Sequence, residues 1–104
     1  MAQLSWSLTA LDSLRAVVDY IERDSPLYAA TLVQRVFDAS RALATFPRMG
    51  RVVPEYDDET LRELIFQGYR IVYKIDSDVV RIVLVIHSVR DLQQQLPEEP
   101  WSLR

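Results

Sequence analysis

The chain has 104 residues, and it contains no cysteine, a single histidine and only two glycines. Without cysteine it can form no disulfide framework, no thiolate nucleophile and no zinc site with thiolate ligands. The one histidine, His87, excludes a metal site that needs several histidine ligands. Two glycines are few for a fold built mainly from loops. We therefore expect a domain of helices and strands that binds no metal and no cofactor.

No apolar run approaches the roughly 20 residues of a membrane-spanning helix, and the N-terminus lacks the features of a signal peptide. Hydrophobic residues make up 49% of the chain and charged residues 26%, as is ordinary for a folded domain. We expect one cytoplasmic domain over residues 1–104. Residues 91–104 hold two prolines and three consecutive glutamines, so this tail is expected to be extended or mobile.

The chain is mildly acidic, with a net charge of −3 and a sequence pI near 5.0. That balance does not favour non-specific binding to nucleic acid. The basic residues are eleven arginines and Lys74 alone. Arginine suits planar, bidentate contacts with carboxylate or phosphate, so the bias indicates specific pairing. A GC-rich genome would explain the same ratio.

A short strand and a helix are expected at the start of the chain. Leu4, Trp6 and Leu8 alternate with serines, which is the period of a half-buried strand. A pattern like a capping box at residues 9–12 then predicts the start of a helix. Apolar residues continue at helical spacing up to the break at Asp24.

A second helix is expected directly after the first. Ser25 is a good N-cap, and Pro26 suits the first helical position because its missing N–H would have no partner there. The apolar stripe of this helix runs to about Thr45. Two amphipathic helices with so short a link predict a helical hairpin. Residues 46–59, with two prolines and a glycine, predict a loop.

Three strands are expected after the loop, at residues 61–66, 69–75 and 79–86. The order is then β-α-α-β-β-β. This order is typical of an α+β domain in which two helices pack on one face of a sheet.

The two tight turns between these strands determine which side chains share a face. A turn at Gln67 and Gly68 pairs Ile65 with Arg70, and the next turn is expected to pair Ile75 with Val80. The face toward the helices is then apolar and holds Leu64, Phe66, Tyr69, Ile71, Tyr73, Ile75, Ile82, Leu84 and Ile86. The opposite face holds Glu63, Arg70, Lys74, Arg81 and His87 among Leu61, Ile65, Val72, Val83 and Val85. The other register would bury unpaired charge at a cost of several kcal/mol.

The charged face has two interpretations. Glu63 with Arg70 or Lys74 would be ordinary cross-strand pairs, which are weak when exposed. Alternatively, Arg70 and His87 are diagonal neighbours with Arg90 just beyond them, a minimum set for binding a phosphate and moving a proton. The apolar residues among them would be exposed, which predicts a partner that covers this face.

The predicted order of helices and strands, together with several segments of the sequence, resembles the RelE/ParE superfamily of toxins from bacterial type II toxin–antitoxin systems. These segments are residues 46–51 with 54–55, 62–64, 69–73 and 87–92. The resemblance covers nearly the whole chain. It implies a helical hairpin packed on a small curved, mainly antiparallel sheet. It also implies a cognate antitoxin whose C-terminal segment wraps around the toxin.

The superfamily divides by target. RelE-like members cleave ribosome-associated mRNA, whereas ParE-like members bind DNA gyrase and need no catalytic centre. For a ribonuclease, the resemblance implies His87 as base or acid and Arg70 with Arg90 as groups that offset phosphate charge. Leu61 and Glu63, however, stand where typical ribonuclease members carry basic residues. A tyrosine common in the C-terminal segment of such members is also missing here.

The favoured hypothesis is therefore a ParE-like toxin that inhibits gyrase by protein binding, with roles in growth inhibition and plasmid stabilization. The alternatives are a RelE-like endoribonuclease acting on the ribosome with mRNA, and a degenerate toxin that retains only antitoxin binding. No membrane partner is expected. The residues predicted to bind a partner are Arg62, Glu63, Arg70, Lys74, Arg81, His87, Arg90 and Trp101, the last being either a docking anchor or folded back.

Overall fold

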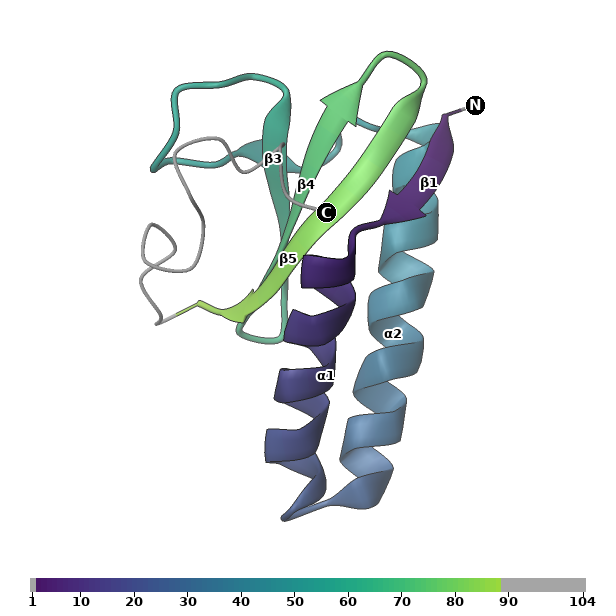
Figure 1. Ribbon diagram of the computed structural model, residues 1–104, viewed down its shortest axis with the longest axis vertical. Coiled ribbons are helices and arrows are strands. Elements are labelled where there is room, and N and C mark those ends of the chain that lie inside the picture. Colours follow the sequence, from purple (N-terminus) through teal and green to yellow (C-terminus); the bar gives the residue numbers. More distant parts are fainter. Residues whose placement is uncertain (1, 89–104) are drawn as a thin grey trace.

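The computed structural model describes residues 2–88, which form two helices packed on a five-stranded sheet (Figure 1). The elements are β1 (Gln3–Trp6), α1 (Leu8–Glu22), α2 (Pro26–Thr45), β2 (Arg51–Val52), β3 (Leu61–Phe66), β4 (Tyr69–Asp76) and β5 (Val79–His87). The strand order is β1-β5-β4-β3-β2, with β1 parallel to β5 and the other pairs antiparallel. The predicted α+β class is confirmed. Within residues 2–88, neither helix has the length and apolar character that a bilayer crossing requires.

Helix α1 begins earlier than the sequence pattern predicts. Ser7 is the N-cap, with an extended backbone and a hydroxyl that accepts a hydrogen bond from the N–H of Ala10 at 3.0 Å. Thr9, the expected cap, therefore lies inside the first turn. The predicted strand accordingly ends at Trp6, and Leu8 is an exposed helical residue. Ser7 is the cap because its hydroxyl accepts a hydrogen bond from an N–H that has no partner within the helix.

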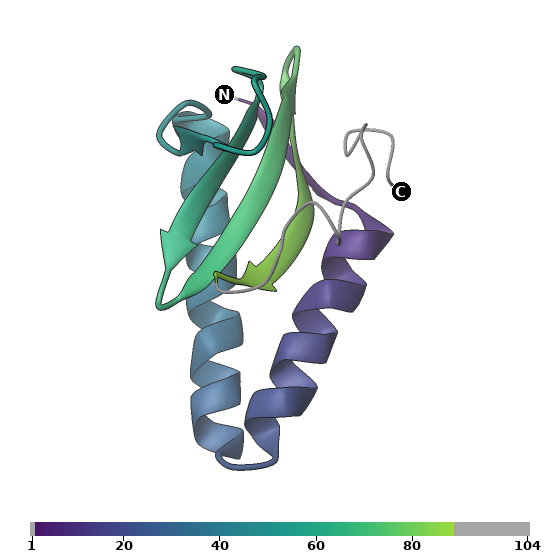
Figure 2. The same ribbon diagram turned by 90° about the vertical axis from the view of Figure 1, so that its left-hand side faces the viewer.

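Helix α2 begins where the sequence predicts. Ser25 accepts a hydrogen bond from the N–H of Tyr28 at 3.2 Å, and Pro26 is the first helical residue. The two helices run side by side as a hairpin (Figures 1 and 2). Their inward residues, with those of the sheet, form the larger core. Its buried members are Ala10, Leu14, Ile21, Ala29, Leu32, Val36, Leu43, Ile71, Tyr73, Val80, Ile82 and Val85.

The predicted register is confirmed between β3 and β4. It is also confirmed between the end of β4 and the start of β5. Ile65 pairs with Arg70, and Ile75 pairs with Val80. A bulge then shifts the register, because β5 has one more residue than β4 between the pairs Tyr73–Ile82 and Val72–Leu84. Beyond this bulge, every β5 side chain lies on the face opposite to the predicted one.

The bulge corrects four placements that the sequence favoured. Leu84 and Ile86 pack on the side away from the helices, whereas Val85 belongs to the helix-side core. The sequence holds no signal for this shift, because residues 82–86 are all apolar and show no alternation. His87 moves with them and pairs with Tyr69.

The face away from the helices is not the open platform that the sequence predicted. It carries a second core of buried residues, made of Val53, Leu61, Val72, Val83, Leu84 and Ile86, with Tyr56 packed against it. Val53 and Tyr56 come from the segment after β2, so this segment covers part of the sheet. The short strand β2 itself was missed, because two residues are too few to show a period.

Candidate functional site

Four charged residues form a chain of ion pairs on the second face. They are, in order, Arg51, Glu63, Arg70 and Glu55. The guanidinium of Arg70 donates from its two terminal nitrogens to both carboxylate oxygens of Glu55, at 2.7 and 2.8 Å. Its Nε donates to Oε1 of Glu63 at 2.5 Å. The other carboxylate oxygen of Glu63 accepts from Nε of Arg51 at 2.6 Å. Two arginines thus face two glutamates, and the chain is neutral as a whole.

Burial makes these contacts strong. The side chain of Glu63 is fully buried and that of Arg70 nearly so, whereas Arg51 and part of Glu55 face solvent. The hydrogen bonds that Arg70 donates to Glu55 raise the pKa of Arg70, against the effect of burial. The hydrogen bond from Arg70 lowers the pKa of Glu55. Each of the three guanidinium nitrogens of Arg70 therefore donates to a carboxylate.

A second polar cluster fixes the same covering segment. Nζ of Lys74 donates to Oδ2 of Asp58 at 3.1 Å and also contacts the hydroxyl of Thr60. The hydroxyl and N–H of Thr60 both donate to Oδ1 of Asp58, at 2.6 and 2.9 Å. The hydrogen bond from the Thr60 hydroxyl is the main cause that lowers the pKa of Asp58. The predicted site residue Lys74 is thus engaged in holding the loop.

The protein is expected to lose stability in acid through these two carboxyl groups. Their pKa values are lower in the folded state than the ordinary values, which are 4.5 for Glu55 and 3.8 for Asp58. A lowered pKa contributes stability above the unfolded-state value, and that contribution is lost as the pH falls through the folded-state value. Urea unfolding should therefore show a constant midpoint from pH 7 to about 5 and a falling midpoint below the ordinary pKa values. In the variant Glu55→Gln the fall should be smaller, and an equal fall would contradict the assignment.

The structure separates Arg70 from His87. Arg70 pairs with Ile86 and points to the second face, while His87 pairs with Tyr69 on the helix side. The imidazole of His87 meets the ring of Tyr69 edge-on, with centroids 5.2 Å apart. The predicted diagonal neighbours thus lie on opposite faces, and the bulge is the cause.

The remaining predicted site residues fall in different places. Arg81 is exposed on the second face, opposite Lys74. Arg62 donates to the carbonyl oxygens of Glu59 and Gly50, at 2.8 and 2.9 Å. Arg90 and Trp101 lie outside the described residues. Within residues 2–88, no group of histidine and acidic side chains is arranged to hold a metal ion.

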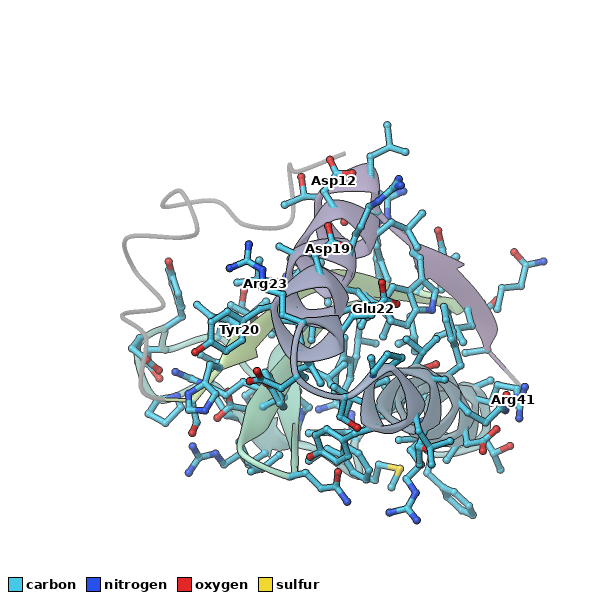
Figure 3. All side chains as sticks on the ribbon, turned by 90° about the horizontal axis from the view of Figure 1, so that it is seen from below. Asp12, Asp19, Tyr20, Glu22, Arg23 and Arg41 are labelled. Atoms are coloured by element: carbon cyan, nitrogen blue, oxygen red, sulfur yellow. The ribbon has the colours of Figure 1, made fainter. Side chains whose placement is uncertain are left out.

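A groove runs between α1 and the last residues of β5. It has a volume of about 560 Å³, and its lining includes Ser13, Val17, Tyr20, Arg23, Tyr69 and His87. Figure 3 shows Tyr20 and Arg23 on the side of α1 that faces β5, while Arg41 lies on the far flank of the molecule. Within this groove, the hydroxyl of Ser13 on α1 accepts a hydrogen bond from the N–H of Val85 on β5 at 2.9 Å. This groove was not predicted, because Tyr20 lies off the apolar stripe and its position beside β5 depends on the tertiary fold.

One tyrosine of β4 holds the segment that follows α2. The hydroxyl of Tyr73 donates to the carbonyl oxygen of Pro47 at 2.6 Å and accepts from the N–H of Gly50 at 3.0 Å. Gly50 is required by close approach, since a Cβ there would stand 2.5 Å from the carbonyl oxygen of Glu63. The sequence signalled a loop here, but the anchoring hydroxyl was not foreseen.

Comparison with known proteins agrees with this fold. The chain is similar in structure to a chain of the chromosomal ParDE toxin–antitoxin system from P. aeruginosa, with a TM-score of 0.69 and 20% sequence identity. The match covers 84% of this chain and 96% of that chain. The chain is also similar, with a TM-score of 0.51 and 23% identity, to a chain of the toxin–antitoxin complex RelBE2 from Mycobacterium tuberculosis, over 83% of this chain and 96% of that one. These identities are low, so the two structures support the fold.

Sequence comparison identifies the family. The chain is 38% identical over 91 residues to Toxin RelE2 of Caulobacter vibrioides, which covers 86% of this chain and 99% of the relative. Residues 4–92 match the family described as the ParE toxin of type II toxin–antitoxin systems, parDE. The chain therefore belongs to the ParE toxin family, within the RelE/ParE superfamily of type II toxin–antitoxin toxins.

Proposed function

We propose that this toxin inhibits DNA gyrase by binding to it and that it needs no catalytic centre. The observation that carries the proposal is the ion-pair chain on the second face. Arg70, the cation that a ribonuclease would use against a phosphate, donates to two carboxylates instead. A phosphodiester arriving there would have to displace both glutamates, one of which is fully buried.

The position of the histidine supports the same proposal. General acid–base catalysis needs the base and the groups that stabilise charge around one reacting atom. His87 lies on the helix side and Arg70 on the second face, so these two side chains do not converge. The acidic net charge of −3 also does not favour approach to RNA.

We further propose that a cognate antitoxin neutralises the toxin and that the groove between α1 and β5 receives part of it. The groove is concave, and its lining combines aliphatic side chains with Tyr20 and Tyr69. Tyrosine offers a large contact area and a polar tip, which suits a protein interface. Tyr20 is among the exposed large apolar side chains of the molecule.

The alternative is a RelE-like endoribonuclease, which the similarity to a protein named RelE2 favours. On that alternative, His87 is the candidate acid or base, with Arg70 and Arg90 as the charge-stabilising groups. The site would then require Arg70 to leave its two carboxylates when RNA binds.

An induction experiment separates the two functions. The toxin is expressed without antitoxin, and two readouts are taken from the same culture: the topoisomer distribution of a reporter plasmid and primer extension on translated mRNA. Gyrase inhibition predicts growth arrest with plasmids of reduced negative supercoiling and intact transcripts. Growth arrest with cut transcripts and unchanged plasmid topology would assign the ribonuclease function. Normal growth would indicate a toxin that retains only antitoxin binding.

A further inference from the structure

One exposed apolar surface lies at the opposite end of β5 from the groove. We name it the α2 corner and define it as Phe46, Pro47, Arg48 and Met49, the four residues that follow α2. They line an open hollow of about 600 Å³ together with Thr45, Ile75 and Ser77. Ser77 lies in the turn between β4 and β5, whereas His87 of the groove ends β5. The two surfaces are therefore separate.

The backbone of the α2 corner is fixed by the body of the protein. Tyr73 bonds to Pro47 and Gly50 from below. The N–H of Phe46 donates to the carbonyl oxygen of Ala42 at 2.9 Å, and that of Met49 donates to Phe46 at 3.1 Å. Because folding has already ordered this segment, a partner that binds it bears little of the entropy cost of ordering a loop.

The two large apolar side chains of the corner, Phe46 and Met49, are exposed. Phe46 is 63% exposed and Met49 is 54% exposed. Two large apolar side chains exposed close together on a fixed backbone are a feature of interaction surfaces. Aromatic residues and methionine are enriched in the buried centre of protein interfaces, and methionine adapts to an irregular partner surface.

Charge indicates which partner fits. Arg48 is the single charged residue among those that line the hollow. Within residues 2–88 no carboxylate forms a salt bridge with it, in contrast to Arg51 and Arg70. A complementary surface would place an apolar side chain against Phe46 and Met49 and a carboxylate against Arg48. One cation beside a thioether and an aromatic ring suits a protein better than the repeated phosphates of a nucleic acid.

We infer that the α2 corner is the surface with which the toxin binds its protein target, at a segment that presents an apolar side chain beside an aspartate or glutamate. This inference rests on the proposed function, in which the target is gyrase. It adds that the target and the antitoxin bind at opposite ends of β5, the target at the α2 corner and the antitoxin in the groove.

The test uses the full chain and purified gyrase. The double variant Phe46→Ser/Met49→Ser and the single variant Arg48→Glu are each compared with a matched control elsewhere on α2. Leu27→Ser serves for the first, because Leu27 is an exposed apolar residue, and Arg35→Glu serves for the second. The corner variants should raise the toxin concentration for half-inhibition of supercoiling about tenfold or more. The controls should stay within about twofold, which is less than the smallest hot-spot effect. Corner variants that inhibit like wild type would overturn the inference.

A second test blocks the corner chemically after the protein has folded, so that misfolding of a variant cannot explain the result. Because the chain has no cysteine, Met49→Cys can be folded first and then labelled at one site with a bulky thiol reagent, with Leu27→Cys as the control. Labelling at residue 49 should abolish inhibition, and gyrase should protect that thiol from the reagent. Equal inhibition by both labelled proteins would overturn the inference, as would protection of residue 49 by RNA.

Failure of the proposed function gives a different pattern. If wild-type toxin arrests growth but leaves gyrase active, gyrase is not the target. The corner is then tested by growth arrest itself. Loss of arrest in Phe46→Ser/Met49→Ser, with arrest retained in Leu27→Ser, would support the corner as a target surface. Arrest retained in both variants would overturn it.

Discussion

Replacing Arg70 with alanine is expected to lower the free energy of unfolding by about 3–5 kcal/mol, because it breaks a buried ion pair by removing one partner. Glu63 would keep a single cation, Arg51, whose side chain is mostly exposed. Glu55 would lose both of its hydrogen bonds to the guanidinium. Urea unfolding followed by circular dichroism measures the change. The control is Arg81→Ala on the same face, since Arg81 is exposed and should cost no more than about 0.5 kcal/mol.

This expected loss changes how activity data must be interpreted. Arg70→Ala lowers the folded fraction of the toxin, so weaker growth arrest in this variant would not by itself show that Arg70 touches RNA. A better variant replaces Arg70, Glu63 and Glu55 together with methionine, because a buried ion pair exchanged for apolar residues of similar volume is often neutral in stability. We expect this triple variant to fold and to inhibit gyrase. A folded triple variant without toxicity would favour the catalytic role of Arg70.

Replacing Leu61 with alanine is expected to cost about 2–5 kcal/mol, because it opens a cavity in the second core. Leu61 is 0% exposed, between the sheet and the segment that follows β2. Ile65, on the same strand and face, is 53% exposed. Ile65→Ala is therefore the matched control and should cost less than about 1 kcal/mol, since little apolar area leaves contact with protein.

The two variants distinguish a covered face from an open one. Thermal or urea unfolding of both variants gives the comparison. Similar small losses for Leu61→Ala and Ile65→Ala would mean that the face is open, as the sequence pattern suggested. The position also bears on function, because a basic residue at 61, such as typical ribonuclease members of the superfamily carry, would have to be buried here.

The elements with local signals were predictable from the sequence. The dipeptide of Ser25 and Pro26 located the start of α2, since cap and first-turn preferences depend on adjacent residues. The turn at Gln67 and Gly68 set the register of β3 with β4, because a two-residue turn pairs the residue before it with the residue after it. The family resemblance followed from segments in the right order and is confirmed by the family match over residues 4–92.

The candidate site depended on features without a local signal. The bulge in β5 opposite Val72 and Tyr73 falls in a run of apolar residues. The sequence there has no alternation of polar and apolar residues that would show which side chains face the helices. That one extra residue moved His87 away from Arg70. The partners of Arg70 were also hidden, because Glu55 lies 15 positions away in a loop whose path over the sheet is set by tertiary packing. Two of the charged residues that alternation placed on an open face, Glu63 and Arg70, are therefore buried and paired.

The most direct test of gyrase inhibition by binding is a titration of purified toxin into a supercoiling reaction with gyrase and relaxed plasmid. We predict that supercoiling falls as toxin is added and that it is restored by the cognate antitoxin at amounts equimolar to the toxin. The variant His87→Ala should inhibit like wild type, because binding at the α2 corner does not involve the imidazole. Full supercoiling activity at a large excess of folded toxin would contradict the proposed function.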